Sequence, residues 1–582
     1  MHTLFTKVDY TISLLIEYID MGIIGLPEIQ RPFVWNTAKV RDLFDSMYKG
    51  FPVGYLLFWS TTNGGQAKQI GTNSKQLSPR LLIVDGQQRL TSLYTIIKGK
   101  PVLNEDYQEK KLSIAFRPKD AQFEVMDAAI LRDPEFIPDI SVIWDNSTSH
   151  IRFVNDFIKK LNDQFPLTKE MEDTISHNID RLYDLQHYPF TALELSSNID
   201  EEEVAKVFVR INSQGVKLNQ ADFILTLMSV FWDEGRKNLE GFSRDCKKPS
   251  TSGPSPFNYF IQPSPDQLLR VCVGLGFKRA RLKYAYSILR GKDLQTEKYS
   301  DEKRIEQFEI LKQSQKYSLD LTNWHEYLNC LKLAGFKSSS MISSDTGLIY
   351  SYVFYLMGKQ AFKVDHFKLR KLIAKWFFMQ AITRRYSSSP ETIMEGDLAR
   401  FREKETSADF SSVLDKLIND ALTDDFWNIT LVNDLSVSSA TSPALFAYQA
   451  SLVILDARVL FSNMKISEFF DPSIKKIKNI ERHHLFPRNY LKKIDIKEIK
   501  ETNQIANYAF VEWTDNIEIS DKSPSEYLPQ YLRRITPEEK NDLYYWHALM
   551  DNWENLDYNK FLEERRKRIA KIIRAGFEKL TQ

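Results

Sequence analysis

Apolar residues along the chain recur at two spacings, and each spacing predicts a different kind of element. Intervals of three and four residues place side chains on one helical face, whereas short apolar runs bounded by turn residues are typical of buried strands. Between these runs, prolines and glycines mark where helices cannot continue. In chain order, the pattern predicts a helix over 12–19, an extended segment over 26–35, a helix from Thr37 (N-cap) to Gly50, a strand over 54–59, a loop over 61–78, a strand over 81–84 and a helix over 90–97.

The rest of the chain is mostly helical in pattern, with no internal repeat. The Ser- and Pro-rich stretch 247–266 is the best candidate for a linker. Further helices are expected over 201–211, 219–232, 267–274, 304–333, 348–357, 369–386 and 411–421, followed by a long apolar helix over 443–461 and a basic helix ending near Leu580.

Composition limits the class of protein. A chain of 582 residues is too long for one core, and 43% hydrophobic with 27% charged residues is ordinary for a globular protein. The formal net charge of +1 gives no overall attraction to polyanions, so any nucleic-acid surface must be a local patch. Cys246, Cys272 and Cys330 show no CxxC spacing, which argues against a cysteine zinc knuckle and a disulfide framework.

Location is predicted from the same features. The sequence begins with no signal-peptide pattern, and the few cysteines fit a reducing cytoplasm. The apolar stretch 443–461 carries Gln449, Asp456 and Arg458, so it is interpreted as a buried helix and not as a membrane span. A cytoplasmic protein without membrane contact is expected.

The most informative motif is Glu-Arg-His-His-Leu-Phe-Pro over 481–487, followed by Asn507 and Asn516. This spacing resembles HNH nucleases, in which two short strands and a helix surround one divalent metal. The resemblance implies that His483 and Asn516 are the metal ligands, His484 is the general base, Asn507 braces the loop of the base and Lys522 lies near the phosphate. Histidine suits the base role because its pKa is close to neutrality. Mg²⁺ is the expected metal, and imidazole ligation also admits Mn²⁺ or Ni²⁺.

The alternative is that the two histidines are ordinary core or surface residues and that two Asn at this spacing arise by chance. Three basic segments are equally open between phosphate contact and a solvated surface, namely Arg565–Lys579, Lys278–Arg281 and Arg384–Arg385.

A second motif, Asp85-Gly86-Gln87-Gln88-Arg89, follows the predicted strand 81–84 and opens a helix. Glycine allows a sharp turn, the carboxylate can hold a metal or water, the amides can bond a phosphate, and arginine can bind one bidentately. Polar residues at two other element boundaries could share this pocket, and the full nucleotide-binding set is Asp85, Gly86, Gln87, Gln88, Arg89, Gln30, Arg31, Arg210, Asn212 and Asp222. Taken one at a time, each could equally be a turn with a surface salt bridge.

Three segments together resemble the N-terminal domain of the GmrSD family, which includes BrxU and SspE. They are Gln30–Trp35, Ile83–Thr91 and Phe208–Asn212 with Gly215, Leu218 and Asp222. The resemblance implies a ParB/sulfiredoxin-like domain that hydrolyses nucleoside triphosphates, with the Asp-Gly-Gln-Gln-Arg motif at its site. The His-His-Leu-Phe-Pro segment resembles the HNH-like nuclease domain of the same family.

We therefore expect an α+β protein in three parts. These are a ParB/sulfiredoxin-like nucleotide-hydrolysing domain over 1–240, a mostly helical connecting domain over 241–430 and a ββα-metal HNH nuclease domain over 431–582. The resemblance implies a type IV (modification-dependent) restriction endonuclease that cuts or nicks modified double-stranded phage DNA, with GTP or ATP binding gating the cut. A homodimer is compatible with this interpretation. The alternatives are a nucleotide-dependent DNA-binding sensor without nuclease activity, and a ParB-like switch that acts on a partner protein.

Overall fold

The computed structural model describes most of the chain. The described residues are 4–27, 33, 35–60, 67–68, 80–103, 109–145, 149–196, 199, 207, 220–293, 296, 298, 300–473 and 480–581. Backbone contacts divide the chain into two compact units, 1–236 and 237–582, and each is considered by itself. The fold is mixed α+β and mostly helical. Within the described ranges, no helix is both long enough and apolar enough to cross a bilayer.

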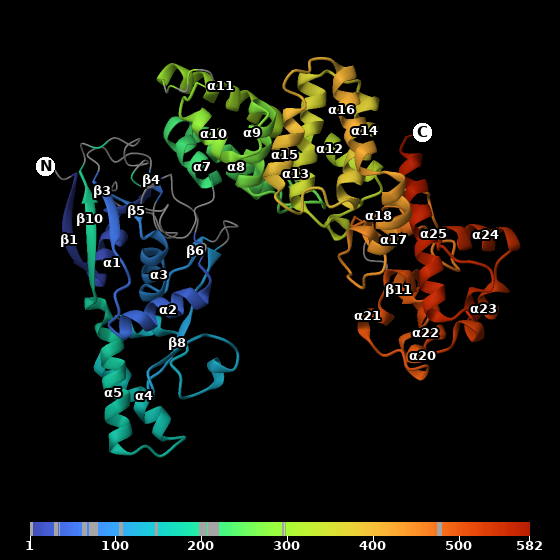
Figure 1. Ribbon diagram of the computed structural model, residues 1–582. Coiled ribbons are helices and arrows are strands. Elements are labelled where there is room, and N and C mark those ends of the chain that lie inside the picture. The colour runs from blue at the N-terminus through green and yellow to red at the C-terminus, as the bar shows by residue number, and fades with distance from the viewer. Residues whose placement is uncertain are drawn as a thin grey trace. The chain divides into compact units, whose positions relative to one another are not determined.

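A mixed sheet of six strands forms the centre of the first unit, in the order β1-β10-β3-β5-β2-β4 (Figure 1). Its pairs alternate between antiparallel and parallel, because β10 joins β3 in parallel while β3 joins β5 in antiparallel register. The strands are β1 (Phe5–Thr11), β2 (Ile24–Pro27), β3 (Leu56–Ser60), β4 (Ala67–Lys68), β5 (Leu81–Asp85) and β10 (Pro189–Leu195).

The two faces of this sheet bury different amounts of apolar surface. Side chains alternate along each strand, so Leu56 and Phe58 join the large core while Leu57 joins a small cluster on the other face. The large core includes the apolar faces of α1 (Ile12–Met21), α2 (Thr37–Tyr48) and α3 (Gln87–Ile97). Helix α3 begins almost directly after the buried strand β5, with Gly86 between the two elements.

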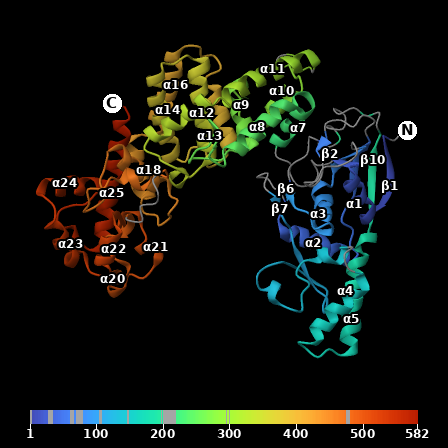
Figure 2. The ribbon, with the colours of Figure 1, turned by 180° about the vertical axis from the view of Figure 1, so that it is seen from behind.

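Short elements complete the first unit. Helices α4 (His150–Asn162) and α5 (Lys169–Tyr183) lie side by side, as Figure 2 also shows. The other elements are the pairs β6 (Val102–Leu103) with β7 (Glu109–Lys110) and β8 (Ile114–Arg117) with β9 (Gln122–Val125), and the helix α7 (Gln220–Phe231).

The second unit is largely helical. Buried aromatic side chains such as Trp324, Trp376 and Tyr352 fill the interior between its helices. The helices are α8 (Asp233–Asp245, which begins before the division), α9 (Pro265–Phe277), α10 (Leu282–Leu289), α11 (Asp301–Ser318), α12 (Leu321–Leu333), α13 (Asp345–Leu356), α14 (His366–Ile382), α15 (Pro390–Ala399), α16 (Ser407–Ala421), α17 (Leu431–Asp434), α18 (Pro443–Ile454), α19 (Ile466–Phe469), α20 (Arg488–Lys493), α21 (Ile499–Thr502), α22 (Trp513–Ile519), α23 (Pro524–Leu532), α24 (Pro537–Trp546) and α25 (Tyr558–Lys579).

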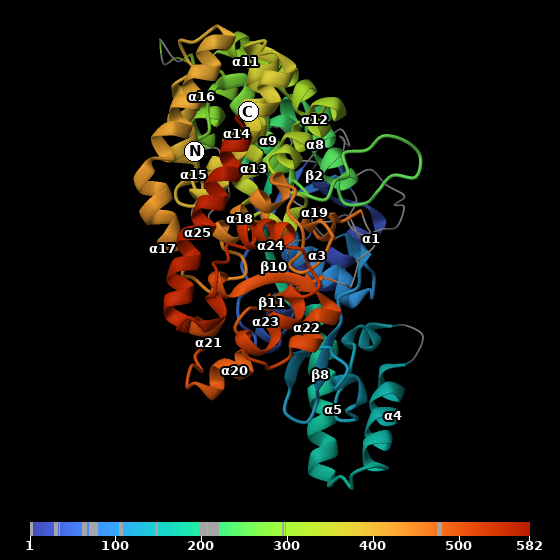
Figure 3. The same ribbon diagram turned by 90° about the vertical axis from the view of Figure 1, so that its right-hand side faces the viewer.

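Among the residues of this unit that are described, β11 (Ile480–His484) and β12 (Tyr508–Glu512) form an antiparallel pair. The long helix α25 packs along α18, as Figure 3 shows, and it also contacts the turn that leads into β12. The strand pair is therefore supported from behind by the last helix.

Several sequence predictions need correction at this level. The helix expected over 304–333 is two helices, because the Asp320 carboxylate accepts from the N–H of Asn323 and starts a new helix there. The apolar helix expected to reach Phe461 ends at Ile454. Asn36, not Thr37, caps α2.

The stretch 247–266 does not act as the predicted linker, since it lies inside the second unit. Phe260 and Ile261 are buried there, and the Pro256 carbonyl accepts from the Trp324 indole. The division at 236/237 is close to the expected boundary at 240. The expected boundary at 430 lies within the second unit and stays a prediction, as do the ParB-like and HNH assignments of the parts.

Candidate functional site

The two histidines lie at the end of β11, on a strand pair followed by a helix. His483 is opposite Ala509 in the register, and His484 is opposite Tyr508. Because β12 leads directly into α22, Asn516 on that helix returns to the strand that carries the histidines. Two strands and a following helix therefore carry His483, His484 and Asn516.

His483 and Asn516 meet directly. The His483 Nδ1–H donates to the Asn516 Oδ1 over 2.6 Å, because an amide oxygen can only accept. This bond leaves the lone pair on Nε2, which is buried and has no hydrogen-bond partner among the described residues. Burial lowers the pKa of His483 to about 4, although the bond to Asn516 acts in the opposite direction. His483 is therefore a neutral imidazole at pH 7 with one unshared lone pair.

His484 is held by a residue that the sequence analysis missed. Its Nε2–H donates to the Asn503 Oδ1 over 3.0 Å, which places the lone pair on Nδ1. Burial lowers the pKa of His484, the bond to Asn503 raises it, and the nearby charges of Arg488 and Arg482 lower it. A neutral, oriented imidazole is the form that can accept a proton.

In the hydrogen bonds that the structure describes, the Asn507 side chain bonds to backbone groups. It is completely buried, and its Oδ1 accepts from the Phe486 N–H over 2.9 Å. Its Nδ2 donates to the carbonyls of Phe486 and Thr502 over 3.1 and 3.0 Å. These bonds tie the turn after His484 to the segment that carries Asn503, which is the contact that a bracing residue needs.

Lys522 is exposed just after α22, where its backbone N–H donates to the Ile519 carbonyl. Two other cations, Arg488 and Arg482, are close enough to lower the pKa of His484. Arg482 and Arg488 are both exposed, and the Arg482 guanidinium lies 4.3 Å from the centre of the Tyr508 ring. Sequence analysis did not select these arginines, although both lie within six residues of His484.

The basic tail is mostly committed to the protein itself. Arg565 is fully buried and donates to the carbonyls of His547, Ala506 and Tyr508. Its neighbour Lys567 pairs with Glu563 and Glu564. The structure thus gives Arg565 a different role from both alternatives, since it holds the backbone on either side of Asn507.

The second predicted site begins at the end of β5. Gly86 has a φ of +96°, and a Cβ there would lie 2.4 Å from a Leu56 methyl group, so the turn requires glycine. Gln87 is buried, and the Gln88 Oε1 accepts from the Trp35 N–H over 3.2 Å. Asp85 is half-exposed and lies 3.3 Å from Arg89.

The Arg89 guanidinium contacts backbone. It donates to the carbonyls of Val53 and Tyr55 over 2.6 and 2.8 Å, and burial lowers its pKa. In this conformation Arg89 fixes the segment before β3 and does not present a free fork to a phosphate. Gln30, Arg31, Arg210 and Asn212 lie outside the described residues. Asp222 lies on the backbone of α7, and its side chain also lies outside what is described.

The turn 85–89 lies inside a region of the chain that matches a known protein family. Residues 12–229 match the GmrSD restriction endonuclease, N-terminal domain. This match supports the resemblance to the GmrSD family that the motifs of the sequence predict. It covers the first unit and leaves the His–Asn cluster of the second unit outside the matched range.

A second comparison covers more of the chain than this family match does. An uncharacterized protein of Methanocaldococcus jannaschii is 23% identical over 555 residues, which cover 88% of this chain and 85% of that protein. The likeness therefore includes both the GmrSD N-terminal region and the region with β11 and β12.

The His–Asn cluster contains donor types that divalent metals accept, an imidazole nitrogen and an amide oxygen. The unshared lone pair of His483 is on Nε2, whereas the Asn516 oxygen is bonded to Nδ1 on the other side of the ring. The two atoms could therefore hold one ion only after this hydrogen bond is broken and the side chains turn. Across the described ranges, no cluster of three or more His, Cys, Asp or Glu side chains could hold a metal. Two protein ligands would leave the remaining positions to water and phosphate oxygens, as Mg²⁺ commonly requires.

Proposed function

We propose that this chain is a modification-dependent (type IV) restriction endonuclease that cuts or nicks modified double-stranded DNA. In this proposal the second unit performs metal-dependent phosphodiester hydrolysis, and nucleoside triphosphate binding in the first unit regulates it. The observation that carries the proposal is the His483–Asn516 contact beside the oriented His484, on two strands and a helix. The match of residues 12–229 to the GmrSD N-terminal domain supplies independent support for the restriction class.

The residues present suggest how hydrolysis would proceed. The free Nδ1 of His484 removes a proton from a water molecule, while Asn503 keeps the ring oriented. His483 and Asn516 would hold a divalent metal, which stabilises charge on the phosphate when bound. Arg482 and Arg488 are exposed close to His484, where they can contact the phosphates on either side of the cut.

The role of the nucleotide is proposed from the first unit. The turn 85–89 opens a helix beside a buried strand, with Asp85 half-exposed. GTP or ATP bound there would act on the residues that approach this turn, including the 53–55 backbone that Arg89 holds. The benefit of such gating is that an unregulated nuclease would damage the DNA of the host.

The test is a nicking assay on supercoiled plasmid. Hydroxymethylcytosine-containing and unmodified DNA are compared with Mg²⁺ or EDTA, and with GTP, ATP or no nucleotide. The proposal expects nicking only of modified DNA, only with Mg²⁺, and changed by a nucleotide. Equal nicking in every lane with Mg²⁺ would remove the modification and gating claims.

The alternative is a nucleotide-dependent DNA-binding sensor without nuclease activity. It expects retardation of modified DNA in a gel at every metal concentration, with no nicks. His366→Ala, an exposed histidine elsewhere in the second unit, serves as the matched control for His484→Ala. Nicking that is lost only in His484→Ala favours the nuclease, and complete absence of nicks with intact binding favours the sensor.

A further inference from the structure

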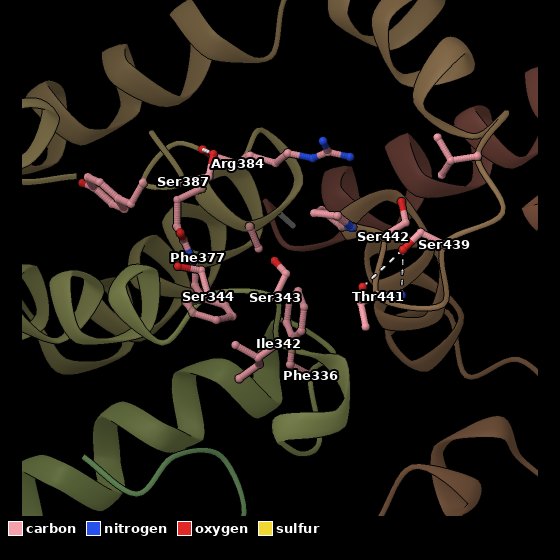
Figure 4. A pocket seen from close by; sticks show the side chains of 15 residues that line it. Phe336, Ile342, Ser343, Ser344, Phe377, Arg384, Ser387, Ser439, Thr441 and Ser442 are labelled. Carbon is pink, nitrogen blue, oxygen red and sulfur yellow. Dashed lines mark hydrogen bonds between the residues drawn. The ribbon is translucent and has the colours of Figure 1, made fainter. Parts of the chain in front are cut away.

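A separate cavity of about 430 Å³ lies among the helices of the second unit, away from the two histidines. Its wall comes from the C-terminal end of α14, the segment before α13 and the segment before α18. Apolar side chains form most of its wall, and hydroxyl groups lie among them, as Figure 4 shows. The serine and threonine residues that line it are Ser343, Ser344, Ser387, Ser439, Thr441 and Ser442.

The helix α18 begins at this cavity without the usual cap. Ser442 is the N-cap residue, yet its side chain makes no capping bond, and Pro443 occupies the first helical position. Helices normally satisfy their first N–H groups through such a side chain. By contrast, Ser344 caps α13 by accepting from the Gly347 N–H. Among the described residues, no side chain therefore caps the positive end of α18, which lies beside the cavity.

Ser442 itself gives a second and independent indication. Ser442 is 3% exposed, and its Oγ has no hydrogen-bond partner in the part of the chain that the structure describes. A buried hydroxyl without a partner costs free energy, so native structures rarely keep one unless something else satisfies it. Rotation about the Cα–Cβ bond can turn this hydroxyl toward the cavity that the residue lines.

Arg384 places a positive charge at the wall of this cavity. It has a left-handed backbone, with a φ of +54°, and its side chain extends toward Ser439 and Ser442 in Figure 4. Its neighbour Arg385 is neutralised by Asp397 at 2.5 Å, whereas none of the described residues forms an ion pair with Arg384. No Asp or Glu is among the described residues that line the cavity.

These features favour the same class of ligand. An uncapped helix N-terminus, an unpaired hydroxyl and an unpaired guanidinium all favour an oxyanion with several acceptor atoms. We propose that this cavity binds the phosphate group of a small ligand, either free orthophosphate or a small phosphorylated molecule such as a nucleoside monophosphate. The volume accommodates such a molecule, and the ligand is distinct from the DNA and the triphosphate of the proposed function.

The test measures binding by isothermal titration calorimetry on the full chain, at ionic strength matched with NaCl. The probes are inorganic phosphate, adenosine monophosphate and adenosine. The variants are Arg384→Gln, Ser442→Ala and, as a charge-matched control, Lys416→Gln, which changes an exposed residue of α16 outside the cavity. Ser442→Ala removes no capping bond, so helix α18 should fold as before.

The proposal expects phosphate to bind the wild type and Lys416→Gln equally. Binding should weaken about tenfold in Arg384→Gln and severalfold in Ser442→Ala, and adenosine should not bind. Stronger binding of adenosine monophosphate than of phosphate identifies a phosphorylated molecule as the source, and the reverse identifies free orthophosphate. Absence of phosphate binding to the wild type overturns the proposal, as does equal binding to Arg384→Gln and Lys416→Gln. A melting curve of each variant without ligand confirms that it is folded.

Discussion

The turn after β5 and the end of β11 both place polar side chains where a short strand stops, but the two regions use these side chains differently. In the first unit, the Arg89 guanidinium is bonded to the carbonyls of Val53 and Tyr55. In the second unit, each histidine has one nitrogen bonded to an Asn oxygen, while its other nitrogen accepts no hydrogen bond among those described. The first region is held together by its polar groups, and the second leaves one lone pair on each imidazole outside the described hydrogen bonds.

This comparison shows that residue type alone does not distinguish a reactive group from a supporting one. Arg565 in the second unit resembles Arg89 because both guanidinium groups donate to backbone carbonyls. A strongly basic segment can therefore be structural, and the decisive information is where its hydrogen bonds go.

The largest expected effect comes from removing the proposed base. His484→Ala should lower the rate of DNA nicking by a factor of about 10² to 10⁴, because general-base catalysis contributes about that much. Nucleotide hydrolysis should be unchanged, since the base belongs to the second unit. Single-turnover nicking rates measure the first effect, and phosphate release measures the second. A variant that nicks at the wild-type rate would contradict the base assignment.

The two buried guanidinium groups can be compared directly. Arg565→Met should lower the free energy of unfolding by about 3–5 kcal/mol, since it leaves three buried carbonyls without their charged donor. Arg89→Met should cost less, about 1–3 kcal/mol, because Arg89 bonds only two carbonyls and Asp85. Urea unfolding of both variants checks the order, and a larger loss in Arg89→Met would reverse the interpretation.

The contact between Asn503 and His484 gives a smaller and more specific effect. Asn503→Ala should slow nicking about tenfold, because the imidazole loses the acceptor that orients it. The bond also raises the pKa of His484, so its loss should move the acid limb of the pH–rate profile to lower pH.

Asn503→Asp is the matched variant, since it restores an acceptor of similar size. A carboxylate would raise the pKa of His484, and the acid limb should move to higher pH. If both variants keep the wild-type profile, Asn503 does not act through His484.

The smallest expected effect is on stability in mild acid. Burial lowers the pKa of His483 to about 4 and that of His547 to about 3, from an ordinary value of 6.5. The unfolded chain therefore binds protons that the folded chain does not, and stability falls as the pH drops below 6.5. Each histidine should cost about 1 kcal/mol between pH 7 and 5.5. Thermal melts across this range measure the loss, and a flat profile would contradict the burial of both rings.

Local patterns predicted the parts of the fold that depend on local spacing. The helices α1 and α2 were predicted within a few residues, and the strand β5 within one, because their apolar residues repeat on one face or form one run. The strands β1 and β10 were missed. They pair with each other although about 180 residues separate them in the sequence, so neither contains a local signal of its partner.

The residues of the candidate site were likewise predicted only where local spacing indicates them. The spacing of the motif led to His483, His484, Asn507 and Asn516, and the structure brings these residues to one strand pair and helix. Asn503 was missed because its contact depends on how the segment 499–507 folds back onto β11. Its position four residues before Asn507 is the one signal in the sequence that could have suggested it.

The bonds of Arg565 have a consequence for how the protein is made. Arg565 follows His484 by about eighty positions in the sequence, yet it fixes the carbonyls on both sides of Asn507. A ribosome must therefore complete the chain through α25 before the strand pair reaches its final geometry. Nascent chains that stop earlier would carry both imidazoles without the support that aligns them.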